Sequence, residues 1–99
     1  MEIKKTADGN VLVLAVSGRL ETVTAPQLDA EIQAIPDDVS ELLMEISELE
    51  YVSSAGLRVF LVAHKKMKSR GGSMKISGAN ASVRKVFDIT GFSPILNFV

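Results

Sequence analysis

The chain has 99 residues, of which 46% are hydrophobic and 23% charged, and its formal net charge is -1. This length fits a single domain over residues 1–99, one that buries roughly two-thirds of the surface exposed by the unfolded chain. The chain has no Cys and one His, which excludes disulfides, thiol nucleophiles, thiolate metal sites and most His-based chemistry. We therefore expect a core held by apolar packing, no enzymatic activity and no cofactor.

Membrane and nucleic-acid roles are also disfavoured. The longest apolar run, Val11–Val16, is far shorter than the ~20 residues that span a bilayer, and the N-terminus lacks the apolar segment of a secretory signal. We expect a cytoplasmic protein without direct membrane insertion. A sequence pI near 5.8 and an aromatic content of 5% argue against general nucleic-acid binding, which requires a basic stripe.

The charges are distributed unevenly along the chain. Residues 20–57 contain nine acids and no Lys or Arg, whereas residues 58–99 contain eight bases and a single acid, Asp88. This pattern fits ordinary solvated faces on separate elements, or alternatively a charged docking face for a protein partner.

The first third of the chain predicts two strands and a helix. Ile3–Ala7 is expected to be an edge strand, joined by a tight turn to Val11–Val16, a strand whose unbroken apolarity suggests cover on both faces. Thr24 and Gln27 have the spacing of a capping box, in which Thr24 accepts a first-turn N–H and Gln27 reaches back. A helix is therefore expected to begin there and to stop at Pro36.

The middle of the chain predicts a strand and a longer helix. Leu42–Ile46 is expected to be a second buried strand, followed by a connection over Ser47–Glu50 and a strand-to-helix junction over Tyr51–Leu57. The helix beyond is expected to stop at Gly71-Gly72. Its apolar stripe consists of Leu57, Phe60, Leu61, His64 and Met67.

The last third predicts a strand over Met74–Ser77, a helix capped by Asn80 and ended by Gly91, and a final extended segment over Ile95–Val99. Strand-helix-strand units impose right-handed parallel crossovers, and the opening hairpin adds an antiparallel pair. The predicted fold is therefore α/β, with a small mixed β-sheet of four to five strands and helices packed largely on one side.

The junction at Ser53-Ser54 is the most informative point of the sequence. In open α/β sheets, sites gather where the carboxyl end of a strand leads into a helix. If Ala55 is the first helical residue, Ser54 is the N-cap, and its hydroxyl lies among unpaired amides that suit an oxyanion or a phosphoserine. The alternative is that Ser54 only caps the helix, which contributes about 1 kcal/mol.

Catalysis by Ser54 is excluded by the position of the only His. His64 lies ten residues further along the same predicted helix, about 15 Å away at a rise of about 1.5 Å per residue and beyond hydrogen-bond reach. The sequence also contains no phosphate-binding loop, dinucleotide fingerprint or metal-ligand cluster.

The segment Tyr51–Val59 resembles the STAS domain (sulfate transporter and anti-sigma factor antagonist), in particular the stand-alone bacterial anti-anti-sigma factors. Gly18–Leu28 is similar to the loop that leads into the first helix of that family, and Gly71–Met74 and Val86–Phe92 are similar to later segments. The resemblance covers nearly the whole chain and implies a single STAS-like domain.

The resemblance implies an anti-sigma factor antagonist. Its unphosphorylated form would bind an anti-sigma factor that is also a serine kinase and thereby free the sigma factor. Phosphorylation on Ser54, or alternatively on Ser53, would switch binding off, and a serine phosphatase would restore it. The implied partner-binding residues lie after the second strand and at the start of the second helix: Glu21, Thr22, Val23, Ser53, Ser54, Ala55, Gly56, Leu57 and Arg58.

At three positions around this site, where family members often carry Asp, this chain has other residues. These positions hold Ser53, Glu21 and Glu45 here, so two of the three keep a negative charge and an acidic surround of Ser54 is expected. The alternative hypothesis is a non-switching STAS module, a scaffold or an accessory subunit of a membrane transporter, in which Ser54 only caps its helix.

Overall fold

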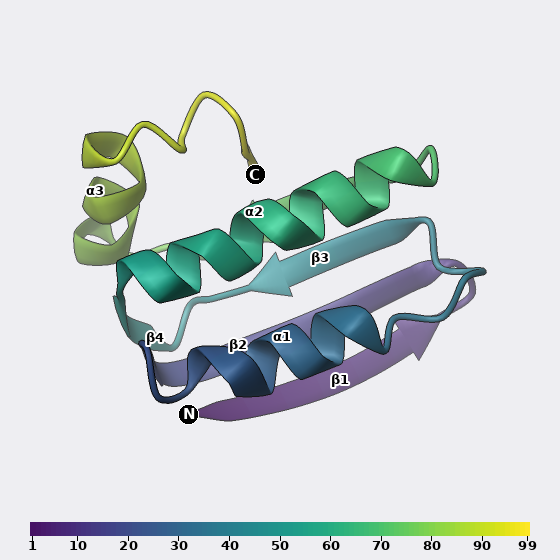
Figure 1. Ribbon diagram of the computed structural model, residues 1–99, viewed down its shortest axis with the longest axis horizontal. Helices are drawn as coiled ribbons and strands as arrows, with labels where there is room; N and C mark the ends of the chain where they lie inside the picture. The colour runs from purple at the N-terminus through teal and green to yellow at the C-terminus, as the bar shows by residue number, and fades with distance from the viewer.

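The computed structural model describes all residues, 1–99. Strands and helices alternate along most of the chain (Figure 1). The strands are β1 (Glu2–Asp8), β2 (Val11–Leu20), β3 (Glu41–Glu45), β4 (Leu49–Val52), β5 (Ser73–Ser77) and β6 (Asn97–Phe98). The helices are α1 (Ala25–Gln33), α2 (Ser54–Ser69) and α3 (Ala81–Ile89). The predicted α/β class, with a small mixed sheet, is confirmed, although the sheet has six strands rather than four or five.

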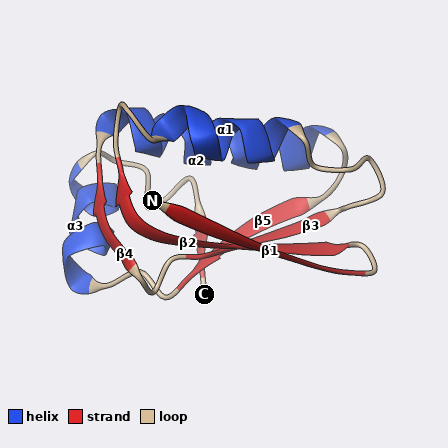
Figure 2. Ribbon diagram, turned by 90° about the horizontal axis from the view of Figure 1, so that it is seen from below, coloured by secondary structure: helices blue, strands red, loops and turns tan.

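The strands run in the order β1-β2-β3-β5-β6, with β1 antiparallel to β2 and the other pairs parallel. Helices α1 and α2 lie side by side over one face of this sheet, while α3 lies at one end (Figure 2). The predicted one-sided packing of the helices is thus confirmed. None of the three helices combines the length and apolarity needed to cross a membrane.

Strand β2 is covered on one face only, so the prediction of cover on both faces is wrong. Leu12, Leu14 and Val16 are buried under the helices, whereas the alternate residues between them are half-buried. The strand reads as continuously apolar because it is central: Val13, for example, is flanked by Thr6 of β1 and Leu43 of β3. Neighbouring strands shield such side chains without a second layer of helices.

A bend in β2 brings a sixth strand into the structure. The first half of β2 pairs with β3, whereas its last residues pair with β4, across an irregularity at Gly18-Arg19. Gly18 has φ 88°, a value that favours glycine. The end of β2 curves toward the helices together with β4 (Figure 2). Leu20, its last residue, packs against Gly56 in the first turn of α2.

The core continues from the helix layer into the C-terminal part of the chain. Phe87 of α3 packs edge-to-face against Phe60 of α2 at 5.3 Å and against Phe98 of β6 at 5.1 Å between ring centroids. The predicted cap of α3 is confirmed, since the N–H of Val83 donates to the side-chain oxygen of Asn80 at 2.9 Å. Asn80 also donates to the carbonyl of Leu49 in β4 at 2.9 Å, which ties α3 to the strand that leads into α2.

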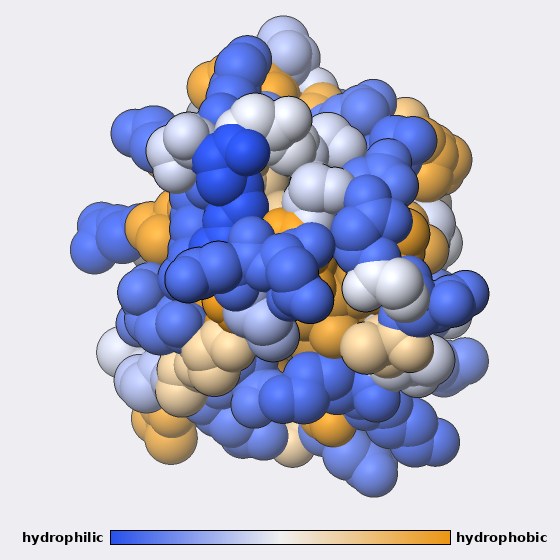
Figure 3. Space-filling view, turned by 90° about the vertical axis from the view of Figure 1, so that its right-hand side faces the viewer, coloured by the Kyte–Doolittle hydropathy of each residue, from blue (hydrophilic) through white to orange (hydrophobic).

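Helix α2 ends where the sequence predicts. Gly71 has φ 76°, and the N–H of Gly72 donates to the carbonyl of Met67 at 2.8 Å while that of Gly71 donates to Lys68 at 3.1 Å, the bonding pattern of a Schellman stop. Arg70 then fixes this end by donating to the carbonyls of Pro36 and Val39 at 2.7 and 3.0 Å. The surface at this end of the molecule is mostly hydrophilic (Figure 3).

Candidate functional site

Two segments that are distant in sequence meet at the start of α2. Leu20, the last residue of β2, pairs with Val52, the last residue of β4, and the N–H of Ser53 donates to the carbonyl of Leu20 at 2.9 Å. The residues that follow Leu20 therefore lie beside the residues that follow Val52. The structure thus brings together the predicted loop Glu21–Val23 and the predicted pair Ser53-Ser54.

Ser53, and not Ser54, is the N-cap of α2, so the predicted start of this helix is wrong by one residue. Ser53 has the extended backbone of a cap (φ -97°, ψ 176°), and its carbonyl accepts from the N–H of Leu57 at 2.9 Å. Either serine suits a cap by residue type. The pairing of Ser53 with Leu20 at the end of the sheet decides between them, and that pairing is not visible in the local sequence.

The two hydroxyls differ in accessibility. The Oγ atom of Ser53 is buried and has no hydrogen-bond partner, whereas Ser54, the first residue of α2, is exposed. A modifying enzyme can reach the Ser54 hydroxyl without opening the structure. It would have to displace packed atoms to reach that of Ser53.

Gly56 and Leu57, which the resemblance placed among the partner-binding residues, are buried in the folded chain. They hold the start of α2 against the sheet. A Cβ atom on Gly56 would lie 2.6 Å from Cγ of Leu20 and 3.0 Å from a methyl of Val52. Of their neighbours, Ala55 is half-buried and Arg58 is exposed.

Gly56→Ala is expected to destabilise the protein by about 1–2 kcal/mol. The clash with Leu20 costs about 1–3 kcal/mol, and the better helix propensity of alanine recovers up to about 1 kcal/mol. Urea unfolding at equilibrium measures this loss. In combination with Leu20→Ala, which removes the clashing atoms, the loss should be smaller than the sum of the two single effects. Additive effects would show that the close approach is not the cause.

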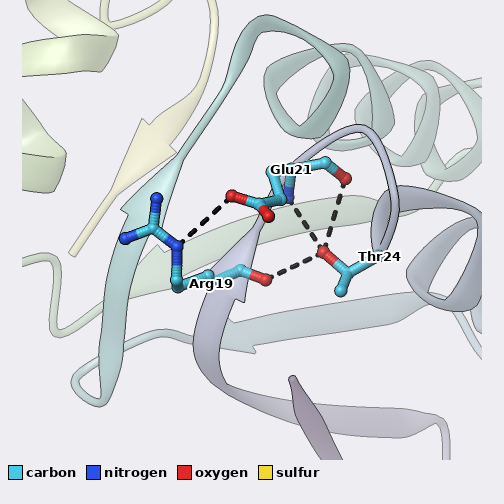
Figure 4. A network of polar contacts seen from close by, with 3 residues as sticks. All are labelled: Arg19, Glu21 and Thr24. Carbon is cyan, nitrogen blue, oxygen red and sulfur yellow. Dashed lines mark hydrogen bonds and ion pairs between the residues drawn. The ribbon is translucent and has the colours of Figure 1, made fainter.

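The loop after β2 is held in shape by a polar network (Figure 4). The hydroxyl of Thr24 accepts from the N–H of Glu21 at 2.9 Å and donates to the carbonyl of Arg19 at 2.8 Å. Thr24 is the N-cap residue of α1, as predicted, but the predicted hydrogen bond from its side chain to a first-turn N–H is wrong. Its side chain turns back into the loop instead. The network instead fixes the loop that presents Thr22 and Val23.

Arg19 and Tyr51 are members of this site that the sequence did not reveal. Nε of Arg19 lies 3.3 Å from a carboxylate oxygen of Glu21, and its guanidinium carbon lies 4.4 Å from the ring centroid of Tyr51. With Thr22, Val23 and Ser53 these residues line an open depression of about 310 Å³. Arg19 and Tyr51 are opposite each other in the pairing of β2 with β4. No local sequence pattern predicts this pairing.

Glu45 is not part of this surface, contrary to the expected acidic surround. It alternates with the buried Met44 and so lies on the sheet face that no helix covers, where its carboxylate accepts from the N–H of Ser47 at 3.0 Å. Glu21 is therefore the one expected acid that borders the site. No group of three or more His, Asp or Glu side chains is placed to hold a metal ion.

The sequence profile of the STAS domain matches residues 2–99. BtrV of Bordetella bronchiseptica is 34% identical over 86 residues, which cover 86% of this chain and 74% of BtrV. The anti-sigma-B factor antagonist of Bacillus subtilis is 27% identical over 88 residues, covering 89% and 81% of the two chains.

Solved structures of anti-sigma factor antagonists have the same fold as this chain. The anti-sigma factor antagonist SpoIIAA in its unphosphorylated form superposes with a TM-score of 0.84 at 20% identity, covering 99% of this chain and 88% of that one. The phosphorylated form of SpoIIAA from Bacillus superposes with a TM-score of 0.78 at 18% identity, covering 99% and 91%. The profile match over almost the whole sequence identifies the chain as a member of the STAS domain family.

Proposed function

We propose that this chain is an anti-sigma factor antagonist whose unphosphorylated form binds a kinase-type anti-sigma factor and whose phosphorylation on Ser54 ends that binding. The observation that carries the proposal is the exposed hydroxyl of Ser54 beside an ordered, exposed loop, while the neighbouring hydroxyl of Ser53 is buried. Relatives that carry the name anti-sigma factor antagonist, and a structural neighbour solved in phosphorylated and unphosphorylated forms, support it.

The proposed binding surface, which we call the switch surface, consists of Glu21, Thr22, Val23, Ser54 and Arg58. Val23 is 84% exposed, so it offers an apolar contact that a partner would remove from water. Its loop is already ordered by the Thr24 hydroxyl, so little conformational entropy is lost when a partner docks. Arg58, four residues after Ser54 on α2, supplies an exposed cation.

In the proposed reaction the chain supplies only the acceptor. The Oγ of Ser54 forms a bond to the γ-phosphorus of ATP held by the kinase, the bond from that phosphorus to the β,γ-bridging oxygen breaks, and ADP leaves. The hydroxyl proton passes to a base of the kinase, since the one His of this chain lies ten residues away along α2. A serine phosphatase would return the hydroxyl by hydrolysis.

The phosphoryl group would weaken the complex by its charge. It adds about -1.5 to -2 at pH 7 to a surface that already carries Glu21. At an interface this charge must be desolvated. It also lies against partner groups that are complementary to a neutral hydroxyl and not to an anion. We propose that the chain and these partners act in the bacterial cytoplasm.

Ser54→Ala is expected to abolish modification, because Ser54 is the exposed one of the two serines at the junction. The wild-type chain, Ser54→Ala and Ser53→Ala would each be recovered from the native host. Their intact masses would be measured, and any phosphoryl group would then be localised. We expect one phosphoryl group on the wild type and none on Ser54→Ala.

Ser53→Ala is the matched control. It removes a buried hydroxyl without a hydrogen-bond partner, so it should leave stability nearly unchanged and modification intact. A phosphoryl group on Ser54→Ala, or its loss from Ser53→Ala alone, would contradict the assignment to Ser54. A wild-type chain that is never modified and co-purifies with transporter subunits would instead favour the accessory-subunit hypothesis.

A further inference from the structure

Arg58 lies one helical turn beyond Ser54 on the same face of α2. Ser54 is the first residue of the helix, Arg58 is four residues further along, and both are exposed. Residues four apart on a helix are neighbours, and helical side chains lean toward the N-terminus. The Arg58 side chain therefore leans over the turn that begins at Ser54.

Arg58 has no partner in the unmodified protein. The four ion pairs of the structure use Lys5, Arg19, Arg70 and Arg84 as their cations, and no side-chain hydrogen bond involves Arg58. Arg19, the other cation near Ser53, is already held by Glu21 and Tyr51. The first turn of α2 contains no acidic residue that could compete for Arg58 within the helix.

On the basis of the proposed function, we propose that Arg58 is the intrahelical counter-ion of the phosphoryl group on Ser54. The planar guanidinium can donate two parallel hydrogen bonds to phosphate oxygens, and an anion that precedes a cation by four residues is the favourable order on a helix. This pairing stabilises the start of α2 against the charge of Glu21. It also withdraws an exposed cation from the switch surface, so that the modification changes two charges presented to a partner.

The pairing is tested by the titration of the phosphoryl group itself. Phosphoserine is incorporated at position 54 during translation of the full chain, and its second ionisation is followed by phosphorus NMR. Because the pair favours the dianion, Arg58→Gln should raise the titration midpoint by roughly 0.3–0.5 pH unit relative to the wild type. Arg58→Lys should keep most of the wild-type value, since it retains the charge.

Lys65→Gln is the matched control. Lys65 is an exposed cation of the same helix, so this variant removes the same charge from a position that is eleven residues from Ser54. Its midpoint should remain within about 0.1 pH unit of the wild type at physiological salt, because separated surface charges are screened. Equal midpoints for Arg58→Gln and Lys65→Gln would overturn the pairing.

This experiment separates the pairing from the proposed function. The phosphoserine is installed without the host kinase, so the titration measures the pairing whether or not Ser54 is modified in the host. An absence of phosphate on the chain recovered from the host would contradict the proposed function, whereas equal midpoints would contradict only the role of Arg58.

Discussion

The substitution Gly72→Ala is expected to lower the free energy of unfolding by about 3 kcal/mol or more. A Cβ atom at Gly72 would lie 1.9 Å from the carbonyl oxygen of Ser40 and 2.8 Å from its carbonyl carbon. These are backbone atoms, so no side-chain rotation relieves the clash. The same carbonyl accepts from the N–H of Ser73 at 2.9 Å. Moving it away would break this bond, which joins the start of β5 to the residue before β3.

Gly71→Ala is the control that distinguishes the cost of this clash from the cost of replacing any glycine at the end of α2. Gly71 has a left-handed backbone, but a Cβ atom there meets nothing within 4 Å, so its substitution should cost only about 1–2 kcal/mol. Urea unfolding of both variants gives the comparison, provided that the slopes agree. The expected loss for Gly72→Ala corresponds to a fall in Tm of roughly 15 °C. If the two variants lose equal stability, Ser40 is free to move and the argument from its carbonyl is wrong.

The elements that could be predicted from the sequence are those specified by neighbouring residues. The turn at Asp8–Asn10, the side-chain cap by Asn80 and the glycine stop of α2 all depend on residues a few positions apart. Strand β4 could not be predicted in this way. Leu49–Val52 pairs with the last residues of β2, across the irregularity at Gly18-Arg19. Until that distant partner is known, Leu49 and Glu50 resemble part of a connection.

The same distinction applies to the candidate site. Its two segments, the Glu21 loop and the Ser53-Ser54 junction, could be expected to meet from the resemblance to the STAS family. Their details follow from tertiary pairing: which serine caps α2, and why Arg19 stacks on Tyr51. Thr24 shows how a local pattern misleads. The capping-box spacing is present, but the hydroxyl of Thr24 hydrogen-bonds three backbone groups of the preceding residues Arg19 and Glu21 instead of an N–H of the helix.

Phosphorylation of Ser54 is expected to weaken the complex with the host anti-sigma factor by about 100-fold, which corresponds to about 2.7 kcal/mol. The dianion lies on the switch surface beside Glu21, and on the inferred pairing it also removes Arg58 from contact with the partner. Both changes act at the same interface and in the same direction. The measurement is the Kd of the phosphoserine-54 chain and the unmodified chain for the anti-sigma factor that co-purifies with Ser54→Ala.

Two variants define the cause of that loss. Ser54→Glu adds about half the charge of the phosphoryl group and should weaken binding by about tenfold. Ser69→Glu adds the same charge at the other end of α2, about 22 Å away along the helix, where Ser69 is also exposed. It should leave the Kd nearly unchanged, because this distance exceeds the screening length of physiological salt. If Ser69→Glu weakened binding as much as Ser54→Glu, the partner would be sensing total charge, and the switch surface would not be the interface.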